Sequence, residues 1–458
     1  MTTPEPPRRR NTELGLLVAA LFVLVVGAAA AGLESKGSVP PALAAIVVVL
    51  GTLAFAAHGV LRRAAPWADP LILPVAVLLN GIGLTVIWAL HQNNGGNGSP
   101  LKQLLWSALG ILAAVAVLAA VRDPRRLQRY PYLMAVAAIV LIAIPIAPVI
   151  GLEIYGARRW IGIGGLTVQP SEFAKITGVV FLASYLVNKR EVLSVAVRRV
   201  TIGRVKVFSI PRLRDTGPVV SAWLAAILLL VGTKDLGTSL LLFALFLSML
   251  YVATQRKSWV AIGLVLFAIG ATIASTVFWH VRQRVDIWLA PFDPEVYRSP
   301  DGSHQVVQGL FALADGGITG TGFVEGRSAR IFAADSDYIL VSIGEKLGLA
   351  GLSAVVVLLA LLVERGYRVA LASRDPAVKM MASGFAFLLA FQTFVVLGGV
   401  TRLIPLTGMT TPLLSAGGSA LLSNWIIVGL WLRMSDTARR PARPTLQSEG
   451  LTQEIALR

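Results

Sequence analysis

Long uninterrupted apolar blocks are the feature that most limits what this chain can fold into. More than half of its 458 residues are apolar and 14% are charged, and the apolar residues form blocks of membrane-spanning length instead of alternating patterns. A hydrocarbon core of about 30 Å is crossed by about 20 residues of helix, and lipid offers no hydrogen-bond partner to a bare backbone. The chain is therefore predicted to be an all-α polytopic membrane protein.

Twelve apolar blocks qualify as membrane spans. The first follows Arg8, Arg9 and Arg10, but it is long for the apolar part of a signal peptide and lacks a clear cleavage site, so we expect it to be retained. The predicted spans lie near residues 14–33, 40–61, 70–90, 103–121, 131–151, 169–187, 217–233, 237–255, 258–280, 338–363, 380–400 and 418–433.

The distribution of Lys and Arg between the spans predicts the orientation in the membrane. With a cytoplasmic N-terminus, the basic loops all fall inside, whereas the outside loops are rich in Gly and Asn or mixed in charge. An even number of spans then places both termini in the cytoplasm. The predicted parts are a cytoplasmic N-terminal tail (1–13), a transmembrane domain (14–433) and a disordered cytoplasmic tail (434–458).

Composition also narrows the chemistry. The chain has no cysteine, which excludes a disulfide, a thiolate metal site and a Cys nucleophile. The net charge is +17, but the basic residues sit in turns between spans, where they set topology or contact anionic membrane lipids. Because no nucleic-acid-binding motif accompanies the charge, nucleic acid is not an expected partner.

A long outer loop at 281–337 is the first candidate for chemistry. Loops of more than about 15 residues are usually functional or disordered, and the aromatic residues of this one indicate that it is partly packed. Its charged and polar groups include Asp293, Asp301 and Gln305. So many charged groups in one outer loop predict a site that opens on the outer face of the membrane.

A second cluster precedes the sixth span. Two adjacent arginines just outside a helix suit a pyrophosphate, because guanidinium groups bind phosphate oxygens bidentately. Pro170 is expected to begin a helix, which places Glu172 and Lys175 on its first turns. Two simpler interpretations stay open: the arginines anchor lipid headgroups, and Glu172 and Lys175 form a structural pair. The candidate residues are Arg158, Arg159, Trp160, Gln169, Ser171, Glu172 and Lys175.

Three carboxylates lie at or near the outer ends of later spans. Asp235 is as much a candidate helix cap as an active-site group, and Asp337 favours the start of a helix. Glu345 falls inside the membrane and needs a partner. That partner is expected to be elsewhere than Lys346, since adjacent residues diverge on a helix.

A third candidate element lies between the last two spans. Its many Gly, Pro and Ser residues predict a re-entrant or broken segment near 401–417, which is tolerated only where it lines a cavity or is buried in protein. A plain loop is the alternative. The candidate residues are Arg402, Pro405, Thr407, Gly408, Ser415, Gly417, Gly418 and Ser419.

At these places the chain resembles the SEDS family of FtsW, RodA and SpoVE. Five motifs occur in order between Tyr155 and Ser419: GARRWI, QPSEFAK, DLGT, the DY and GEKLG pair, and PLTG followed by SAGGS. The chain departs from the usual pattern at Lys234, Lys346 and Ala416. Two spans precede the usual ten, which is similar to the RodA-type subgroup.

The resemblance implies a peptidoglycan glycosyltransferase. It would join the disaccharide units of lipid II to a growing glycan chain outside the cytoplasmic membrane, together with a class B penicillin-binding protein, in elongation and cell shape. Three alternatives stay open. A lipid-linked precursor flippase would use charges along a path through the bilayer, a non-catalytic scaffold would tolerate loss of the loop carboxylates, and an FtsW-like polymerase would serve division.

The resemblance also implies a catalytic Asp in the long outer loop. Aligning from the left selects Asp293, which we prefer, and aligning from the right selects Asp301. This carboxylate would take the proton of the acceptor hydroxyl. Arg158, Arg159 and Lys175 would stabilise the leaving pyrophosphate. A divalent cation, Mg²⁺ or Mn²⁺, is a candidate cofactor, although no metal-ligand spacing is readable.

Overall fold

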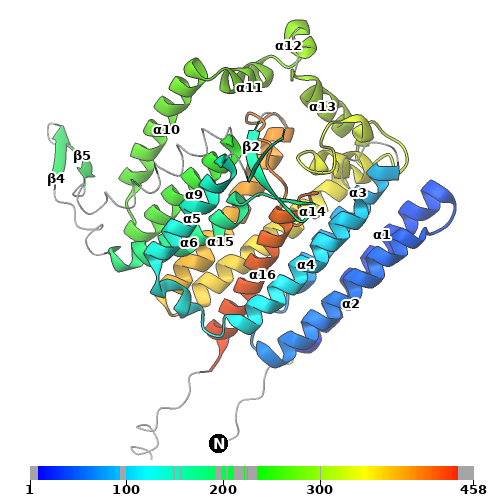
Figure 1. Cartoon of the computed structure of the whole chain (residues 1–458), viewed down its shortest axis with the longest axis horizontal. Helices are drawn as coiled ribbons and strands as arrows, with labels where there is room; N and C mark the ends of the chain where they lie inside the picture. Colours follow the sequence, from blue (N-terminus) through cyan, green and yellow to red (C-terminus); the bar gives the residue numbers. More distant parts are fainter. Residues whose placement is uncertain are drawn as a thin grey trace, which may run out of the picture.

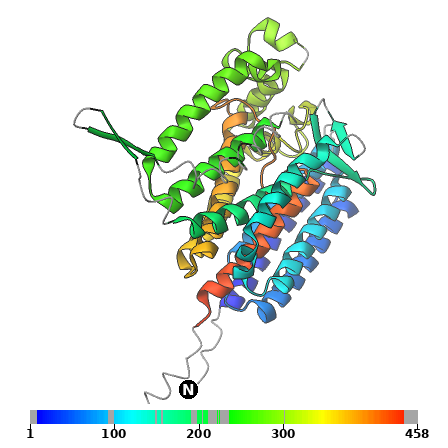
Figure 2. The same ribbon diagram turned by 60° about the vertical axis from the view of Figure 1, so that its left-hand side comes forward.

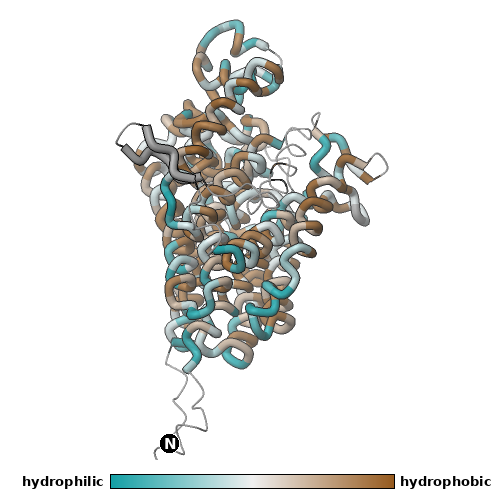
Figure 3. Tube along the Cα trace, turned by 90° about the vertical axis from the view of Figure 1, so that its left-hand side faces the viewer, coloured by the Kyte–Doolittle hydropathy of each residue, from teal (hydrophilic) through white to brown (hydrophobic). Residues whose placement is uncertain are grey.

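The computed structural model describes residues 9–92, 99–147, 150–154, 157–190, 198–202, 205–210, 221, 224, 235–299 and 301–441. Within these residues the fold is mostly helical, and eight helices are long and apolar enough to cross a membrane. Hydrophobic residues dominate the body of the bundle (Figure 3). The first helix begins, and the last helix ends, at the same end of the bundle (Figure 1). The chain is a multi-pass membrane protein, as predicted.

Eleven of the twelve predicted spans correspond to helices. The predicted span at 217–233 lies almost wholly outside the described residues. The helices are α1 (Arg9–Lys36), α2 (Pro41–Ala64), α3 (Ile72–Gln92), α4 (Pro100–Ala120), α5 (Pro131–Ala143), α6 (Ser171–Asn188), α9 (Leu236–Thr254), α10 (Lys257–Val277), α14 (Ile339–Ala372), α15 (Pro376–Val400) and α16 (Gly418–Arg439).

Several boundaries differ from the prediction. Helix α1 begins at Arg9, within the predicted N-terminal tail, and α16 continues to Arg439, within the predicted C-terminal tail. Most of the tail predicted to be disordered, 442–458, lies outside the described residues. The helix α5 stops early, at Ala143, and a 3₁₀ turn, η2 (Ile144–Ile146), follows. Pro145 lies in that turn, and proline cannot donate the backbone hydrogen bond that would continue an α-helix.

Helix α14 is two helices joined at Gly348, a break that the sequence analysis missed. Gly348 has a φ of +68°, and its Cα lies so close to the preceding loop that an added Cβ would be 2.3 Å from the Ile318 carbonyl oxygen. The backbone N–H groups of Leu349 and Ala350 donate instead to the carbonyls of Gly317 and Ile318, over 2.9 and 3.1 Å. These two bonds satisfy backbone donors that the break frees, and lipid would offer them no partner.

The core of the bundle lies around α3 and α16. In α3, 89% of the most apolar window is buried. Small residues let backbones approach closely, which is how helices associate in lipid. An added Cβ on Gly83 would be 2.3 Å from the carbonyl oxygen of Leu414, and one on Gly110 of α4 would be 2.4 Å from the Trp425 ring of α16.

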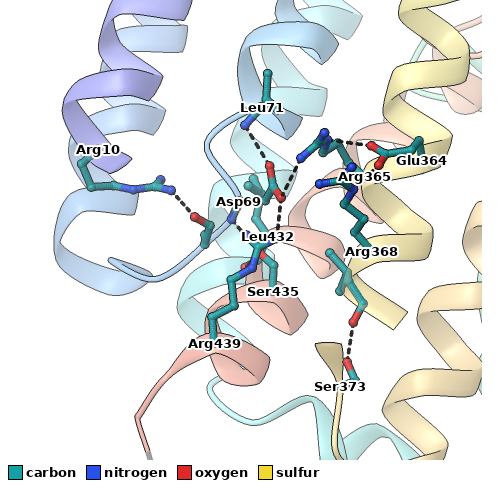
Figure 4. A network of polar contacts seen from close by, with 12 residues as sticks. Arg10, Asp69, Leu71, Glu364, Arg365, Arg368, Ser373, Leu432, Ser435 and Arg439 are labelled. Carbon is teal, nitrogen blue, oxygen red and sulfur yellow. Dashed lines mark hydrogen bonds and ion pairs between the residues drawn. The ribbon is translucent and has the colours of Figure 1, made fainter. Parts of the chain in front are cut away.

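A network of buried charges ties three elements together at the end where the chain starts and finishes (Figure 4). Asp69, in the turn before α3, accepts a hydrogen bond from Arg439 of α16 over 2.6 Å and lies 4.0 Å from Arg365 of α14. Its own backbone N–H donates to Ser435 over 3.0 Å. Each charged side chain pairs with one of opposite charge, so we interpret the network as a structural link between the three elements.

The opposite end carries a small antiparallel sheet that was predicted only as a loop. It consists of β1 (Gly151–Ile154), β2 (Ala157–Ile163) and β3 (Leu166–Val168), in that order. A second hairpin, β4 (Arg198–Ile202) with β5 (Val205–Ile210), was also not predicted. The strands are only three to seven residues long, so they give little periodic signal.

The long outer loop folds into an arch over this end of the bundle (Figures 1 and 2). It contains α11 (Trp279–Leu289), α12 (Pro294–Arg298), α13 (His304–Gly316) and the 3₁₀ turn η3 (Ser328–Arg330). The arch is reached through α10, in which only Gly263 is buried. A helix that is apolar all round and has little protein contact is stable only in lipid.

Candidate active site

The two adjacent arginines point to opposite sides of strand β2. Successive side chains alternate across a strand, so only one of the pair can face the bundle. Arg158 is exposed and pairs with Glu153 of β1 over 3.0 Å. Arg159 is more buried, stacks on Trp160 at 4.6 Å from the ring centre, and places Nη1 3.7 Å from Oδ1 of Asp235. Of the two predicted phosphate ligands, the structure brings Arg159 into the cluster of charges and leaves Arg158 outside it.

Asp235 is both a helix cap and a member of this cluster. Its Oδ1 accepts a hydrogen bond from the backbone N–H of Thr238 over 3.2 Å, which caps α9. Its Oδ2 accepts one from Nε2 of Gln169, also over 3.2 Å. The side chain is only 4% exposed. The carboxylate therefore fixes the outer start of α9 and holds Gln169 and Arg159 against it.

Arg284 of the arch and Asp337, just before α14, complete the cluster. Arg284 of α11 donates from Nη1 to the carbonyl oxygen of Leu406 over 2.8 Å. Burial lowers its pKa, and the nearby Arg159 lowers it further, while Asp337 and Asp235 raise it. Burial raises the pKa of Asp337 in turn, although Arg159 and Arg284 oppose the shift. We call Arg159, Arg284, Asp235 and Asp337 the outer charge cluster.

The predicted re-entrant segment is non-helical from Thr401 to Gly417 and contacts the outer charge cluster. Gly408, with a φ of +69°, lies against Asp337, since an added Cβ would be 3.4 Å from its Oδ2. The Thr407 carbonyl oxygen lies 3.0 Å from the position of a Cβ on Gly237, at the start of α9. Pro405 is partly buried in the same stretch. The segment is therefore seated between the starts of α9 and α14.

Hydrogen bonds hold the second half of this segment. Ser415 accepts from the backbone N–H of Thr411 and donates to the carbonyl of Ser336, each over 2.7 Å. Ser419 accepts from the backbone N–H of Gln169 over 3.1 Å, which joins the segment to the start of α6. Gly418 leaves no room for a side chain, since an added Cβ would be 2.1 Å from the Trp106 ring. Gly417 is the N-cap of α16.

The charges of α6 pair inside the bundle. Nζ of Lys175 lies 2.7 Å from Oε2 of Glu172, and the two side chains are 3% and 7% exposed. Nζ also donates to Oε1 of Gln392 on α15 over 3.3 Å, and Ser423 donates to Glu172 over 3.2 Å. Ser171 accepts from Gln169 over 3.0 Å. This geometry favours the structural-pair interpretation of Glu172 and Lys175.

The two loop carboxylates lie on the arch and not in the outer charge cluster. Asp293 is exposed and caps α12, accepting from the backbone N–H of Glu295 over 2.8 Å. Asp301 is exposed and has a φ of +56°. Arg402 holds the base of the arch, because its Nε and Nη2 donate to the carbonyls of Trp288 and Leu289, each over 2.8 Å. The assignment of a base between the two aspartates stays a prediction.

The remaining two candidates have structural partners. Glu345 is fully buried, and its two carboxylate oxygens accept from the backbone N–H groups of Arg327 and Ser328 over 2.7 and 2.9 Å. Its partner is thus not Lys346, which donates to the carbonyl of Phe323 over 2.8 Å. Gln305 donates to the carbonyl of Phe332 over 2.6 Å. Both residues shape the outer loop.

Comparison with known proteins identifies the family. The FtsW/RodA/SpoVE family model, described as cell cycle protein, matches residues 66–440. The chain belongs to this family. The match begins after α2, so the N-terminal pair of helices α1 and α2 lies outside the matched residues.

Relatives of the FtsW/RodA/SpoVE family match nearly the whole chain. The peptidoglycan glycosyltransferase RodA of Mycobacterium tuberculosis is 43% identical over 96% of this chain and 93% of its own length. The probable peptidoglycan glycosyltransferase FtsW of Geobacter metallireducens is 31% identical over 80% and 94%. The crystal structure of Thermus thermophilus RodA matches with a TM-score of 0.56 at 23% identity, covering 82% of this chain and 98% of that one.

Two residues of this family member's site were missed by the sequence analysis. Arg284 is one of many charged residues in the outer loop, and no local pattern distinguishes it from Arg282 or Arg298. Gln392 could have been found, because a lone amide in the apolar run of α15 calls for a partner. No three His, Asp or Glu side chains of the described residues form a group that could hold a metal ion.

Proposed function

We propose that this chain is a peptidoglycan glycosyltransferase that polymerises lipid II on the outer face of the cytoplasmic membrane. The observation that carries the proposal is the 43% identity, over 96% of the chain, to the mycobacterial protein of that activity. The family match over residues 66–440 spans every part of the candidate site. The greater similarity to RodA than to FtsW relatives favours a role in elongation and cell shape over one in division.

The proposed orientation places both termini in the cytoplasm. The loops at the end that holds the termini carry most of the Arg and Lys residues, which is the pattern of cytoplasmic loops. The sheet, the arch and the outer charge cluster then face the outside. A lipid-linked disaccharide in the outer leaflet would meet the cluster at the level of its pyrophosphate.

The two arginines of the outer charge cluster supply positive charge for that pyrophosphate. Negative charge grows on the leaving group as the glycosidic bond forms, and guanidinium groups fixed in a partly buried site stabilise it without reorganising. Arg159 and Arg284 come from the sheet and the arch, so they approach from two directions. Asp235 and Asp337 balance the arginines in the absence of substrate and orient them.

A carboxylate of the arch is proposed as the general base. As the acceptor 4-hydroxyl oxygen attacks the anomeric carbon of the donor, its proton passes to the carboxylate, and the bond to the undecaprenyl pyrophosphate breaks. Asp293, with Asp301 as the alternative, is the candidate. Both side chains are exposed on the outer side, where a growing glycan would lie.

A divalent cation, Mg²⁺ or Mn²⁺, stays a proposal. The described residues form no three-carboxylate or histidine group, so such an ion would need oxygens of the pyrophosphate in addition to Asp235 or Asp337. It would supply charge to the leaving group. No step of the mechanism above depends on it.

A class B penicillin-binding protein is the proposed partner. One similar solved structure, at 25% identity and a TM-score of 0.54, is described as the structural coordination of polymerization and crosslinking by a peptidoglycan synthase complex. A polymerase that leaves its product outside the membrane needs a crosslinking enzyme there.

The test is polymerisation of lipid II by the purified chain together with its cognate penicillin-binding protein. Wild type is compared with Asp293→Ala and Asp301→Ala, after each variant is shown to fold and to bind the partner. We expect glycan chains from wild type and none from one of the two variants. Polymer from both variants would refute the assigned base, and no polymer from wild type would refute the glycosyltransferase proposal.

A further inference from the structure

A hollow of about 320 Å³ lies at the cytoplasmic end of the bundle, far from the outer charge cluster along every helix that forms it. It is bounded by the last turns of α6 and α9 and by the first turn of α15. Three basic side chains line it, Arg190, Arg374 and Lys379, together with apolar residues such as Leu186, Val252 and Met380. Hollows of this size hold small ligands and headgroups.

The described residues that line this hollow carry only positive charge. No carboxylate is among the described residues that line it, and within the described part of the chain none of the three basic groups has an ion-pair partner. Asp375, next to Arg374, instead caps α15 by accepting from the backbone N–H groups of Ala377 and Val378, each over 3.0 Å. The described lining of the hollow therefore presents positive charge to a ligand.

A neighbouring hollow shows the contrast. It has a volume of about 400 Å³ and shares Arg374, but its other basic residues are neutralised. Arg125 lies 3.6 Å from Asp375, and Arg440 lies 2.7 Å from Asp436. Arginines that already have an acidic partner gain little from a further anion. Arg190, Arg374 and Lys379 are exposed beside the apolar walls of the first hollow and are therefore open to an anionic ligand.

We propose that the hollow of Arg190, Arg374 and Lys379 binds the phosphate headgroup of an anionic phospholipid of the cytoplasmic leaflet. The apolar walls come from the ends of membrane helices, where the glycerol and first methylenes of a lipid lie. Basic pockets between such helix ends on the cytoplasmic side are typical sites for anionic headgroups. The inference depends on the proposed orientation and not on the glycosyltransferase activity.

The experiment measures lipid retention by native mass spectrometry of the purified full-length chain. The lipids are phosphatidylglycerol, cardiolipin and the zwitterionic phosphatidylcholine, each offered alone. The test variant is Arg190→Gln/Arg374→Gln/Lys379→Gln. The matched control, Arg63→Gln/Arg122→Gln/Arg126→Gln, removes the same charge from exposed residues at the same end of the bundle.

We expect wild type and control to retain the anionic lipids and to bind phosphatidylcholine weakly. Affinity of the test variant should fall on the order of 100-fold, because each basic residue near an anionic headgroup contributes about fivefold. Should the test variant fail to fold, Arg374→Gln alone is expected to lose about fivefold. Equal retention by test and control variants, or equal binding of phosphatidylcholine, would overturn the proposal.

A further arm distinguishes a lipid from a soluble anion. Excess inorganic phosphate is added to wild type loaded with phosphatidylglycerol. A lipid site is expected to keep its lipid, since the apolar walls contribute to binding. Complete displacement of the lipid by inorganic phosphate would show that the hollow recognises a free phosphate and would refute the assignment to the membrane.

Discussion

Arg284 of the arch donates a hydrogen bond to the carbonyl oxygen of Leu406, 2.8 Å away, and so joins α11 to the segment between α15 and α16. The same guanidinium lies within the electrostatic reach of Arg159, Asp235 and Asp337. One side chain of the outer loop thus links the arch, the non-helical segment and the outer charge cluster. None of these connections is visible in the order of the sequence.

Arg284→Ala is therefore expected to reduce kcat/KM for lipid II polymerisation by about 100-fold or more, as loss of a charge-stabilising donor does. Arg298→Ala, which removes an exposed arginine of the same arch, is the matched control and should stay within a few-fold of wild type. Equal effects of the two substitutions would mean that activity depends on the total charge of the arch and not on the position of Arg284.

The two adjacent arginines of β2 should differ in effect. Arg159→Ala removes a partner of Asp235 and a cation of the outer charge cluster, and activity is expected to fall by about 100-fold or more. Arg158→Ala breaks only an exposed pair with Glu153, which contributes at most about 1 kcal/mol to stability. The initial rate of glycan formation measures the effect of each substitution. A larger loss from Arg158→Ala would contradict the assignment of the two faces of β2.

The raised pKa of Asp337 gives stability a defined pH dependence. A carboxyl whose pKa is higher in the folded state than in the unfolded state favours folding while it is protonated. That contribution is full below the unfolded pKa and is lost as the pH rises through the folded pKa.

Asp337→Asn should consequently flatten the pH dependence and raise the unfolding temperature at pH above the folded pKa, while it abolishes polymerisation. Unfolding temperatures of both proteins in the same detergent across a pH series measure the effect. Parallel curves for wild type and variant would show that Asp337 does not titrate in that range.

Glu345 is expected to matter for stability more than for binding. Glu345→Ala leaves the buried N–H groups of Arg327 and Ser328 without an acceptor, at a cost of about 1–3 kcal/mol each. Glu345→Gln keeps one acceptor oxygen and should cost less, and Glu325→Ala, on the exposed part of the same loop, should cost little. An unchanged unfolding temperature for Glu345→Ala would contradict this role.

The membrane spans could be predicted from the sequence because lipid imposes a length and a composition on each helix separately. The fold of the loops outside the spans could not be predicted, since it depends on contacts between segments that are distant in the sequence. The strand β2 divides Arg158 from Arg159 only because it pairs with β1. Likewise, α14 breaks at Gly348 because the loop from Gly317 supplies acceptors for the freed N–H groups. Within the candidate site, the motif residues were predicted, whereas Arg284 was missed because only the fold of the arch brings it to Leu406.

The buried pair of Glu172 and Lys175 decides between two roles for the lysine. If the pair is structural, Lys175→Met leaves a buried carboxylate without its cation and should destabilise the protein by about 3–5 kcal/mol. Glu172→Gln should destabilise it in the same way, and the double variant Glu172→Gln/Lys175→Met should recover most of the loss, because neither charge is then left alone.

Unfolding temperatures and lipid II polymerisation of the three variants together test this. A structural pair predicts that the double variant regains activity along with stability. If the double variant is as stable as wild type but makes no glycan, the charged pair itself takes part in the reaction, and the pyrophosphate must lie deeper in the bundle than the outer charge cluster. In that case Gln392, which accepts from Lys175 over 3.3 Å, would hold the ammonium toward the substrate instead of toward Glu172.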